Sequence, residues 1–373
     1  MRAQAFVLVG LLLAYIAGSV IPLIPLPFDI FATASRPVST SVFAPFGFGL
    51  EAFIGPLALL ELAKLVSPRL ANWQIRSIRN ASWLNDGVLV VAMIVVGLQA
   101  YGIFRVAHVI RSEDVGVFSL VAGIASYVGA TALLTWLAYL ITDNGPSEGF
   151  WLLWILPPVV ASSKIAVALY ELTAKGTMPL FTLLLEVGFT LSACVGLVVA
   201  NLVLIGGPDP STKAAINPDK ALAERLASMA IIWPPLLTYV ILNLARPVLA
   251  HFVTRTAEPP VWFRSYSVVY CLLVAGLIML FSWAYARRRL VSWHEIGNVF
   301  DTNPSPYYVP APFWLLGLLQ AMICVGELIL RHVMPYWHSL FNGPALIVLV
   351  TVAMSFIRGW GFLPLKPRPS DRR

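Results

Sequence analysis

Long apolar segments repeat along almost the whole chain, each close to the length of a membrane-spanning helix. A helix needs about 20 apolar residues to cross the hydrocarbon core of a bilayer. An unpaired backbone group in lipid costs several kcal/mol, so each segment is expected to be helical. The pattern predicts ten spans, near residues 5–26, 45–66, 86–108, 118–142, 149–170, 179–206, 225–248, 264–285, 311–333 and 342–358.

Composition agrees with a polytopic membrane protein. Charged residues make up 12% of the chain and hydrophobic residues 59%, whereas a soluble domain carries roughly 25% charged residues. The apolar segments leave no room for a separate soluble domain. We therefore expect an all-α membrane protein, and we read residues 5–26 as an uncleaved first span rather than a signal peptide.

The net charge of +7 is explained by the membrane and does not call for nucleic acid. Lys and Arg collect in cytoplasmic loops, and no basic stripe alternates with exposed aromatic residues. With the N-terminus inside, Lys and Arg on the cytoplasmic side outnumber those outside by about two to one. We therefore expect the protein in the inner (cytoplasmic) membrane, with both termini in the cytoplasm. Anionic lipid is the expected counter-charge for the basic loops.

The sequence offers little for catalysis or metal binding. Cys194, Cys271 and Cys324 all lie inside apolar segments and are expected to be small buried hydrophobes, without a disulfide. The histidines do not have ligand spacing, and no phosphate-binding loop of nucleotide hydrolases occurs. We expect no enzyme activity, no metal and no cofactor, so that energy for any transport comes from a partner or from the membrane gradient.

Four acidic residues fall within predicted spans, at Glu51, Glu61, Glu186 and Glu327. A charge inside a membrane is costly and is a functional hypothesis by default. A carboxylate beside a gate would hydrate it or bind a basic group of a partner. The alternatives are that these side chains face water or pair inside the bundle, as Glu186 would with Lys164.

Short motifs at the ends of the spans occur in a definite order. The first span ends in Ile24-Pro25-Leu26-Pro27 after Gly18. The others are Phe46–Leu50 with Leu65–Leu70, the stretch Trp136-Leu137-Ala138-Tyr139-Leu140-Ile141-Thr142-Asp143-Asn144-Gly145 with Gly149, Ile232–Leu236, and Asn342–Val348.

These motifs resemble, in the same order, those of the SecY family of protein-conducting channels, and the resemblance extends over essentially the whole chain. It implies about ten transmembrane helices in two pseudo-symmetric five-helix halves, residues 1–175 and 176–373. It also implies an apolar pore ring, which seals by dewetting, and a lateral gate toward lipid. The ring would consist of Leu50, Ile54, Trp154, Leu236 and Val348.

The resemblance assigns the lateral gate to Glu61 and to the pair Pro234-Pro235, which removes two backbone donors from the seventh span and permits a kink. The alternative is that the prolines are tolerated and locally satisfied. The run Arg287-Arg288-Arg289 is a candidate docking site for a cytoplasmic partner, or else an anchor of the positive-inside kind.

The sequence also departs from the family pattern. Tyr139 and Leu140 stand where the family has glutamate and glutamine, and the loop near 207–224 is short. The loop at 286–311 lacks the arginine of the family's I-P-G-I-R-P-G stretch, and it reads Pro304-Ser305-Pro306-Tyr307-Tyr308-Val309-Pro310 instead. Since these two loops receive the ribosome and the motor ATPase in the family, docking is expected to be non-standard. The external segment Phe28–Ala44 is either a connecting loop or a segment that folds back into a cavity, shorter than the family's plug.

Several functions remain open at this point. The first is a SecY-like channel that translocates or inserts a restricted set of polypeptides, with a small SecE-like subunit and a motor or accessory protein as possible partners. The second is a SecY-derived scaffold that does not conduct. The third is an unrelated secondary transporter that uses Glu51 and Glu61 as proton or cation sites. An intramembrane enzyme ranks below these because no nucleophile–base pair is visible.

Overall fold

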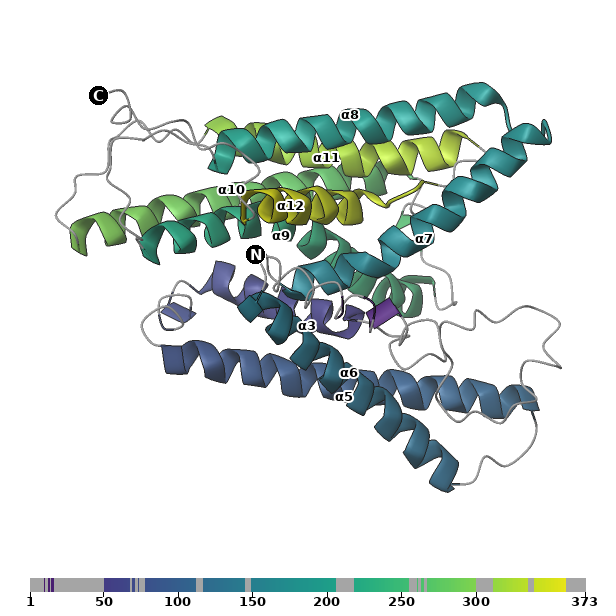
Figure 1. The fold of residues 1–373 in the computed structure, drawn as a ribbon, viewed down its shortest axis with the longest axis horizontal. Helices are drawn as coiled ribbons and strands as arrows, with labels where there is room; N and C mark the ends of the chain where they lie inside the picture. The colour runs from purple at the N-terminus through teal and green to yellow at the C-terminus, as the bar shows by residue number, and fades with distance from the viewer. Residues whose placement is uncertain are drawn as a thin grey trace. The chain divides into compact units, whose positions relative to one another are not determined.

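The computed structural model is all-helical in the part of the chain that it describes (Figure 1). That part consists of residues 10, 13, 15–16, 50–67, 69–70, 73, 78–111, 117–144, 149–205, 218–254, 260, 263–264, 267–299, 311–334 and 339–359. Its helices are α3 (Glu51–Val66), α5 (Ile78–Arg111), α6 (Val117–Asn144), α7 (Gly149–Ala174), α8 (Leu180–Ile205), α9 (Pro218–Leu249), α10 (Val268–Val299), α11 (Ala311–Val333) and α12 (Gly343–Gly359), with a π-helical turn at Ala250–Thr254 after α9.

Each of these nine α-helices in the described part coincides with a predicted span. The predicted first span at 5–26 lies almost entirely outside the described residues, so the total of ten is not tested. The segment Phe28–Ala44 also lies outside them. Three helices extend well beyond their predicted segments, since α5 begins at Ile78, α9 begins at Pro218 and α10 continues to Val299.

Seven helices of the described part, α5 to α11, are long and apolar enough to cross a membrane. The apolar part of α12, Gly343–Ile357, is shorter. At 1.5 Å per residue, the 16 residues of α3 extend only about 24 Å, less than the roughly 30 Å of a bilayer core. The chain is a multi-pass membrane protein.

The chain divides into two compact units, Met1–Pro157 and Pro158–Arg373. The boundary falls between the two adjacent prolines of α7, so the first turns of α7 belong to the first unit and the remainder to the second. The predicted symmetry between residues 1–175 and 176–373 stays a prediction.

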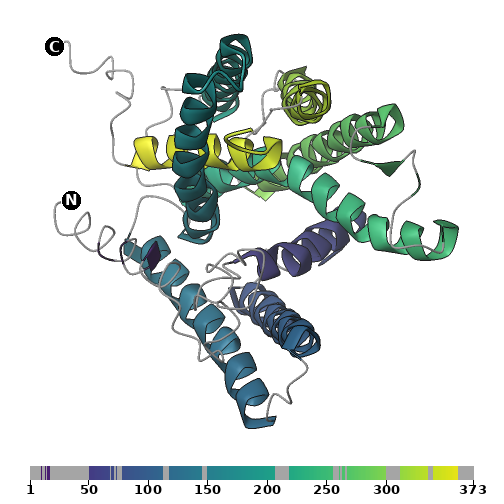
Figure 2. The same ribbon diagram turned by 90° about the vertical axis from the view of Figure 1, so that its right-hand side faces the viewer.

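In the first unit α5 packs against both α3 and α6, and α5 and α6 lie side by side in both views (Figures 1 and 2). Their contact is built around Phe104 of α5 and Tyr127 of α6, which share a buried cluster with Val96. At Gly123 of α6 a Cβ atom would lie 2.0 Å from the Phe104 ring. A glycine is therefore required at this point for the two helices to approach as closely as they do.

In the second unit α12 contacts α8, α9 and α11, and α10 contacts α9 and α11 (Figure 1). The sequence of α12 is apolar on all sides, without a charged residue between Gly343 and Ile357. A helix that is hydrophobic all round is expected to be surrounded by protein or lipid. Most of its residues from Ala345 to Met354 are buried, so α12 is a central element of this unit.

Candidate functional site

The first predicted ring residues lie at the start of α3 in the first unit. Leu50 immediately precedes the helix, and its carbonyl accepts the Phe53 N–H at 3.1 Å. Leu50 and Ile54 are both buried, whereas Glu51 between them is exposed. Residues four apart share a helix face, so these two aliphatic side chains form one apolar surface at this end of α3.

A chain of aromatic rings connects α3 to the start of α7 within the same unit. Phe53 meets Phe150 edge to face with the centroids 6.1 Å apart. Phe150 meets Trp151 in the same way at 5.0 Å, and Trp151 meets the predicted ring residue Trp154 at 6.1 Å. Edge-to-face contacts of this kind are favourable beyond the area that they bury. The sequence shows the aromatic residues of α7, but it does not show that they pack against Phe53 of α3.

The predicted gate residue Glu61 is not a solitary carboxylate. Lys64, one turn further along α3, donates to its Oε1 at 2.5 Å. Each side chain keeps only 8% of its accessible surface. The ion pair places the counter-charge in the same helix, at a spacing of three residues that brings two side chains together on one helix face.

The second unit holds the other predicted ring and gate residues. Leu236 of α9 and Val348 of α12 are both fully enclosed, and the two helices contact each other. The prolines Pro234 and Pro235 precede Leu236 in an uninterrupted buried stretch, residues 231–238. The prolines therefore lie in an enclosed part of α9 rather than at a surface.

Hydrogen bonds from side chains surround this proline pair. The Thr238 hydroxyl donates to the Pro234 carbonyl at 2.9 Å. From α11, the Gln320 side-chain amide donates to the Ile231 carbonyl at 2.7 Å. From α10, the Ser282 hydroxyl donates to the Gln320 side-chain oxygen at 3.3 Å. Sequence reasoning did not identify Gln320, because a lone glutamine in an apolar helix gives no indication of its partner.

Two buried carboxylates hold the connection between α11 and α12. Glu186 of α8 is fully buried, and its Oε1 accepts the Leu340 N–H at 3.0 Å. Glu327 of α11 accepts a hydrogen bond from the Ser339 hydroxyl at 3.2 Å and pairs with Arg331 at 2.6 Å. These contacts anchor residues 339–340 in the segment that leads into α12, which begins at Gly343.

The pairing of Glu186 with Lys164, one of the alternatives that the sequence left open, is not found. Lys164 is exposed on α7, while the Glu186 carboxylate is enclosed and bonded to the backbone of Leu340. Proximity along the sequence of two spans does not fix which faces of the helices meet. A buried carboxylate still needs hydrogen-bond donors, and here a backbone N–H of the segment before α12 is one of them.

Thr142 and Gly149 of the most distinctive sequence motif form a close contact, the corner, between the end of α6 and the start of α7. The Thr142 hydroxyl donates to the Ala138 carbonyl at 2.9 Å and accepts the Gly149 N–H at 2.9 Å. A Cβ atom at residue 149 would lie 2.2 Å from the Ala138 carbonyl oxygen. The threonine and the second glycine of the motif therefore have a definite structural role, which is to satisfy and accommodate the first turn of α7.

The arginine run is helical rather than part of a loop. Helix α10 continues through Arg287, Arg288 and Arg289 and ends at Val299. The end of the apolar span is therefore not the end of the helix. Arg287 is exposed and lies over the Trp283 ring at 5.6 Å. The side chains of Arg288 and Arg289 are outside the described part, and docking at this run stays a prediction.

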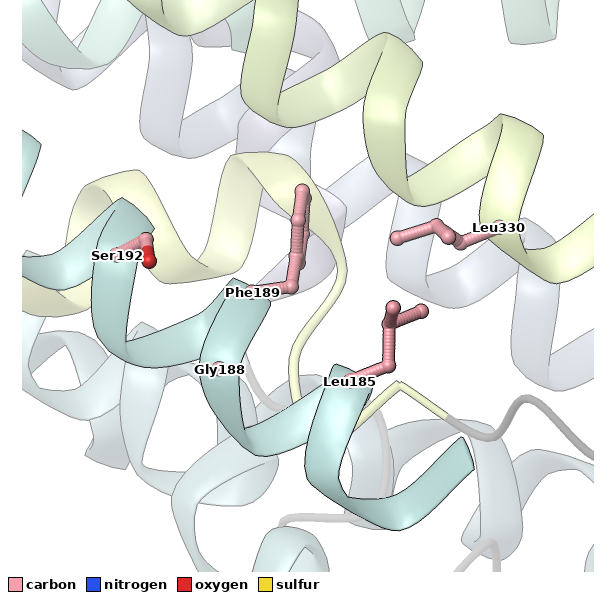
Figure 3. Close-up of a pocket in the computed structure, with 5 residues that line it drawn as sticks. All are labelled: Leu185, Gly188, Phe189, Ser192 and Leu330. Carbon is pink, nitrogen blue, oxygen red and sulfur yellow. The ribbon is translucent and has the colours of Figure 1, made fainter. Parts of the chain in front are cut away.

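An open apolar groove runs between α8 and α11 on the second unit (Figure 3). Its volume is about 360 Å³, and its lining consists of Leu185, Gly188, Phe189, Ser192 and Leu330. In Figure 3 the side chains of Leu185 and Phe189 on α8 face Leu330 on α11. The groove contains neither a predicted ring residue nor a predicted gate residue. Such a surface is compatible with contact to lipid.

The described residues do not present a metal centre. Within them, no group of three or more His, Cys, Asp or Glu side chains is arranged to hold a metal ion. Cys194, Cys271 and Cys324 are all free thiols. The expectation that the chain uses no metal and no cofactor remains a prediction.

Comparison with known proteins relates this fold to solved structures. No protein-family model matches the chain, and no curated protein matches it. The chain is similar to a structure of the SecY protein, whose plug domain is described as stabilising the closed state of the translocation channel and maintaining a membrane seal. The likeness covers 95% of this chain and 90% of that chain, with a TM-score of 0.57 and 11% sequence identity. The chain therefore has a SecY-like fold.

Proposed function

We propose that this chain is a SecY-like membrane channel that translocates or inserts a restricted set of polypeptides and is not itself an enzyme. The observation that carries the proposal is the likeness to SecY over nearly the full length of both chains. The fold alone does not assign a function. The proposal therefore depends equally on the residues of this chain at the positions where a channel needs them.

A channel for polypeptides must block ions when it is closed. A constriction of apolar side chains does so by excluding water, without a polar group for an ion to use. The proposed ring is apolar throughout, with Leu50, Ile54 and Trp154 in the first unit and Leu236 and Val348 in the second. All but Trp154 are buried, and Trp154 is half-buried.

The proposed lateral gate uses α3 and α9. A helix interrupted by Pro234 and Pro235 lacks two backbone donors and bends more readily than an unbroken one. Glu61 and Lys64 provide a polar feature on α3. The resemblance to SecY assigns the gate to these residues, and we propose that polypeptide segments reach the lipid when α9 bends.

Partners follow from the same proposal. The translocating or inserting polypeptide is the substrate, and a small SecE-like subunit and a motor or dedicated accessory protein are the proposed companions. The helical run Arg287–Arg289 is the proposed contact for that cytoplasmic partner or for anionic lipid. We place the protein in the cytoplasmic membrane with both termini on the cytoplasmic side, in keeping with the loop charges.

Ion flux in reconstituted vesicles tests the channel. Asparagine at Leu50 or at Val348 introduces a polar group into the proposed seal, and we expect the leak to rise roughly tenfold or more as the constriction hydrates. The matched control is Leu59→Asn, because Leu59 lies on the same helix as Ile54 but is exposed. An unchanged leak in both ring variants would contradict the channel and favour a non-conducting scaffold.

Clients and transport mode are tested separately. Gentle purification from the native membrane, with crosslinking and mass spectrometry, should recover a secreted or inserted polypeptide together with any small subunit. A transporter would instead show solute uptake that depends on a pH gradient and disappears in Glu61→Gln. The Glu61 carboxylate is buried and already paired with Lys64 of the same helix, which argues against a binding site for an exchanging cation, and for this reason we favour the channel.

A further inference from the structure

The proline pair of α9 leaves specific backbone carbonyls without their helical partners. In an α-helix the N–H of each residue donates to the carbonyl four residues earlier. Proline has no N–H, so Pro235 cannot donate to Ile231 and Pro234 cannot donate to Ala230. An unpaired carbonyl in the enclosed part of a membrane helix is costly, and a substitute donor is therefore expected.

Gln320 of α11 is the substitute donor for one of these two carbonyls. Its side-chain nitrogen lies 2.7 Å from the Ile231 carbonyl oxygen, the carbonyl that Pro235 leaves without a partner. Gln320 is fully buried. The Ser282 hydroxyl donates to the other end of the amide. Because the Ile231 carbonyl can only accept a hydrogen bond, the end of the amide that faces it is the end that carries the nitrogen.

The backbone of α11 is shaped to bring these groups together. At Gly317, one turn before Gln320, a Cβ atom would lie 2.9 Å from the Cβ and the hydroxyl oxygen of Ser282. Without a side chain at residue 317, α10 and α11 approach closely enough for Ser282 to reach Gln320. Three helices of the second unit thus converge on one amide. On the far side of the prolines, Thr238 bonds back to the Pro234 carbonyl, an arrangement that often bends helices.

We propose that Gln320 is a latch for α9: its amide supplies the donor that Pro235 withholds, and release of this one bond frees α9 to bend at Pro234-Pro235. A neutral hydrogen bond has a modest net strength, so such a latch is reversible. Gln320 acts through α9 and is a positioning residue. The latch goes beyond the proposed function, and only its connection to gate opening rests on that function.

A cycle of substitutions distinguishes a latch from ordinary packing. Gln320→Leu removes the donor at similar volume, and Pro235→Ala restores a backbone N–H for the Ile231 carbonyl. We expect Gln320→Leu to lower the Tm in detergent by roughly 4 °C in the unaltered chain and by much less in the Pro235→Ala background. Pro234→Ala is the matched control, because it restores a donor for Ala230 and not for Ile231, so the full loss should persist there.

Equal losses in the two alanine backgrounds would overturn the latch. If Gln320→Leu does not fold, the double variant Gln320→Leu/Pro235→Ala decides the matter, since the latch requires this variant to fold. Its failure to fold would assign Gln320 to packing. Gln99→Leu, on an exposed site of α5, controls for the loss of a glutamine as such and should leave the Tm unchanged.

Local flexibility provides a second readout. Amide hydrogen exchange reports opening of individual backbone bonds. We expect exchange in the peptide that contains Leu237, Thr238 and Tyr239 to be roughly tenfold faster in Gln320→Leu than in the unaltered chain. The reason is that α9, once released, bends and opens its backbone hydrogen bonds in this region more often. Exchange should return toward its original rate when Pro235→Ala is added. Unchanged exchange in Gln320→Leu would count against the latch.

Ion flux then separates the latch from the channel. A leak that rises in Gln320→Leu and falls again in Gln320→Leu/Pro235→Ala supports both proposals. Coupled Tm values without any flux, including in Leu50→Asn and Val348→Asn, support the latch and contradict the channel. Tm values without coupling contradict the latch whatever the flux.

Discussion

Glu61 and Lys64 form a buried ion pair inside a single helix, with the carboxylate and the ammonium 2.5 Å apart. Two charges taken out of water are stable only while they compensate each other. Each partner therefore depends on the other for its stability. A substitution that removes the Glu61 charge leaves the Lys64 ammonium buried without its counter-charge, which destabilises the protein.

The first prediction concerns this dependence. Glu61→Gln should destabilise the protein by about 3 kcal/mol, because it leaves an uncompensated buried ammonium, and the double variant Glu61→Gln/Lys64→Met should recover most of that loss. Thermal unfolding in detergent measures both effects. The exposed pair of Glu171 in α7 and Lys175 in the turn that follows it, 3.4 Å apart, is the control, and Glu171→Gln should cost less than about 1 kcal/mol. Additive losses at residues 61 and 64 would show that the pair is not coupled.

The second prediction concerns the corner between α6 and α7. Gly149→Ala should cost roughly 1–3 kcal/mol, because its Cβ has no space beside the Ala138 carbonyl and the start of α7 must shift. Gly188→Ala is the control, since a Cβ at residue 188 of α8 meets nothing within 4 Å. The comparison is made by thermal unfolding. Equal stability of the two variants would mean that the corner adjusts without strain.

The sequence predicted where the helices of the described part lie but not where they end. Length and apolar content locate a span because the bilayer imposes both. They do not report that α9 begins at Pro218 or that α10 runs to Val299, because a helix does not have to stop at the edge of the apolar window. The motif around Thr142 and Gly149 was recognised as a resemblance, and only the structure gave it a physical role.

The third prediction concerns the anchor before α12. Glu186→Leu removes an acceptor of the Leu340 N–H and should cost roughly 1–3 kcal/mol through the buried donor left behind. Hydrogen exchange at Leu340 should become faster. Ser339→Ala is the comparison, because it removes the hydroxyl contacts with Glu327 and Arg331 but not the Glu186 carboxylate, and it should leave the Leu340 amide protected. Unchanged exchange in Glu186→Leu would mean that another group holds this segment.

The polar contacts of the candidate site could be predicted only where they are local. The spacing of Glu61 and Lys64 is readable from the sequence, since residues three apart on a helix are neighbours. The partners of Glu186 and Gln320 lie 154 and 89 residues away along the chain. Such contacts depend on which helix faces meet, and apolar periodicity is weak in helices that are surrounded on all sides.

The last prediction concerns the size of the proposed constriction. Trp154 ends the aromatic chain that starts at Phe53 and is the bulkiest member of the proposed ring. In the leaky background Leu50→Asn, the further change Trp154→Ala should increase single-channel conductance, because it removes the large indole from the water-filled path. Planar-bilayer recording measures this directly. Trp136→Ala is the control, since Trp136 is exposed on α6 and its loss should leave conductance unchanged. Equal conductance with and without the Trp154 indole would place this residue away from the constriction. It would not change the conclusion drawn from the leak of the Leu50→Asn variant.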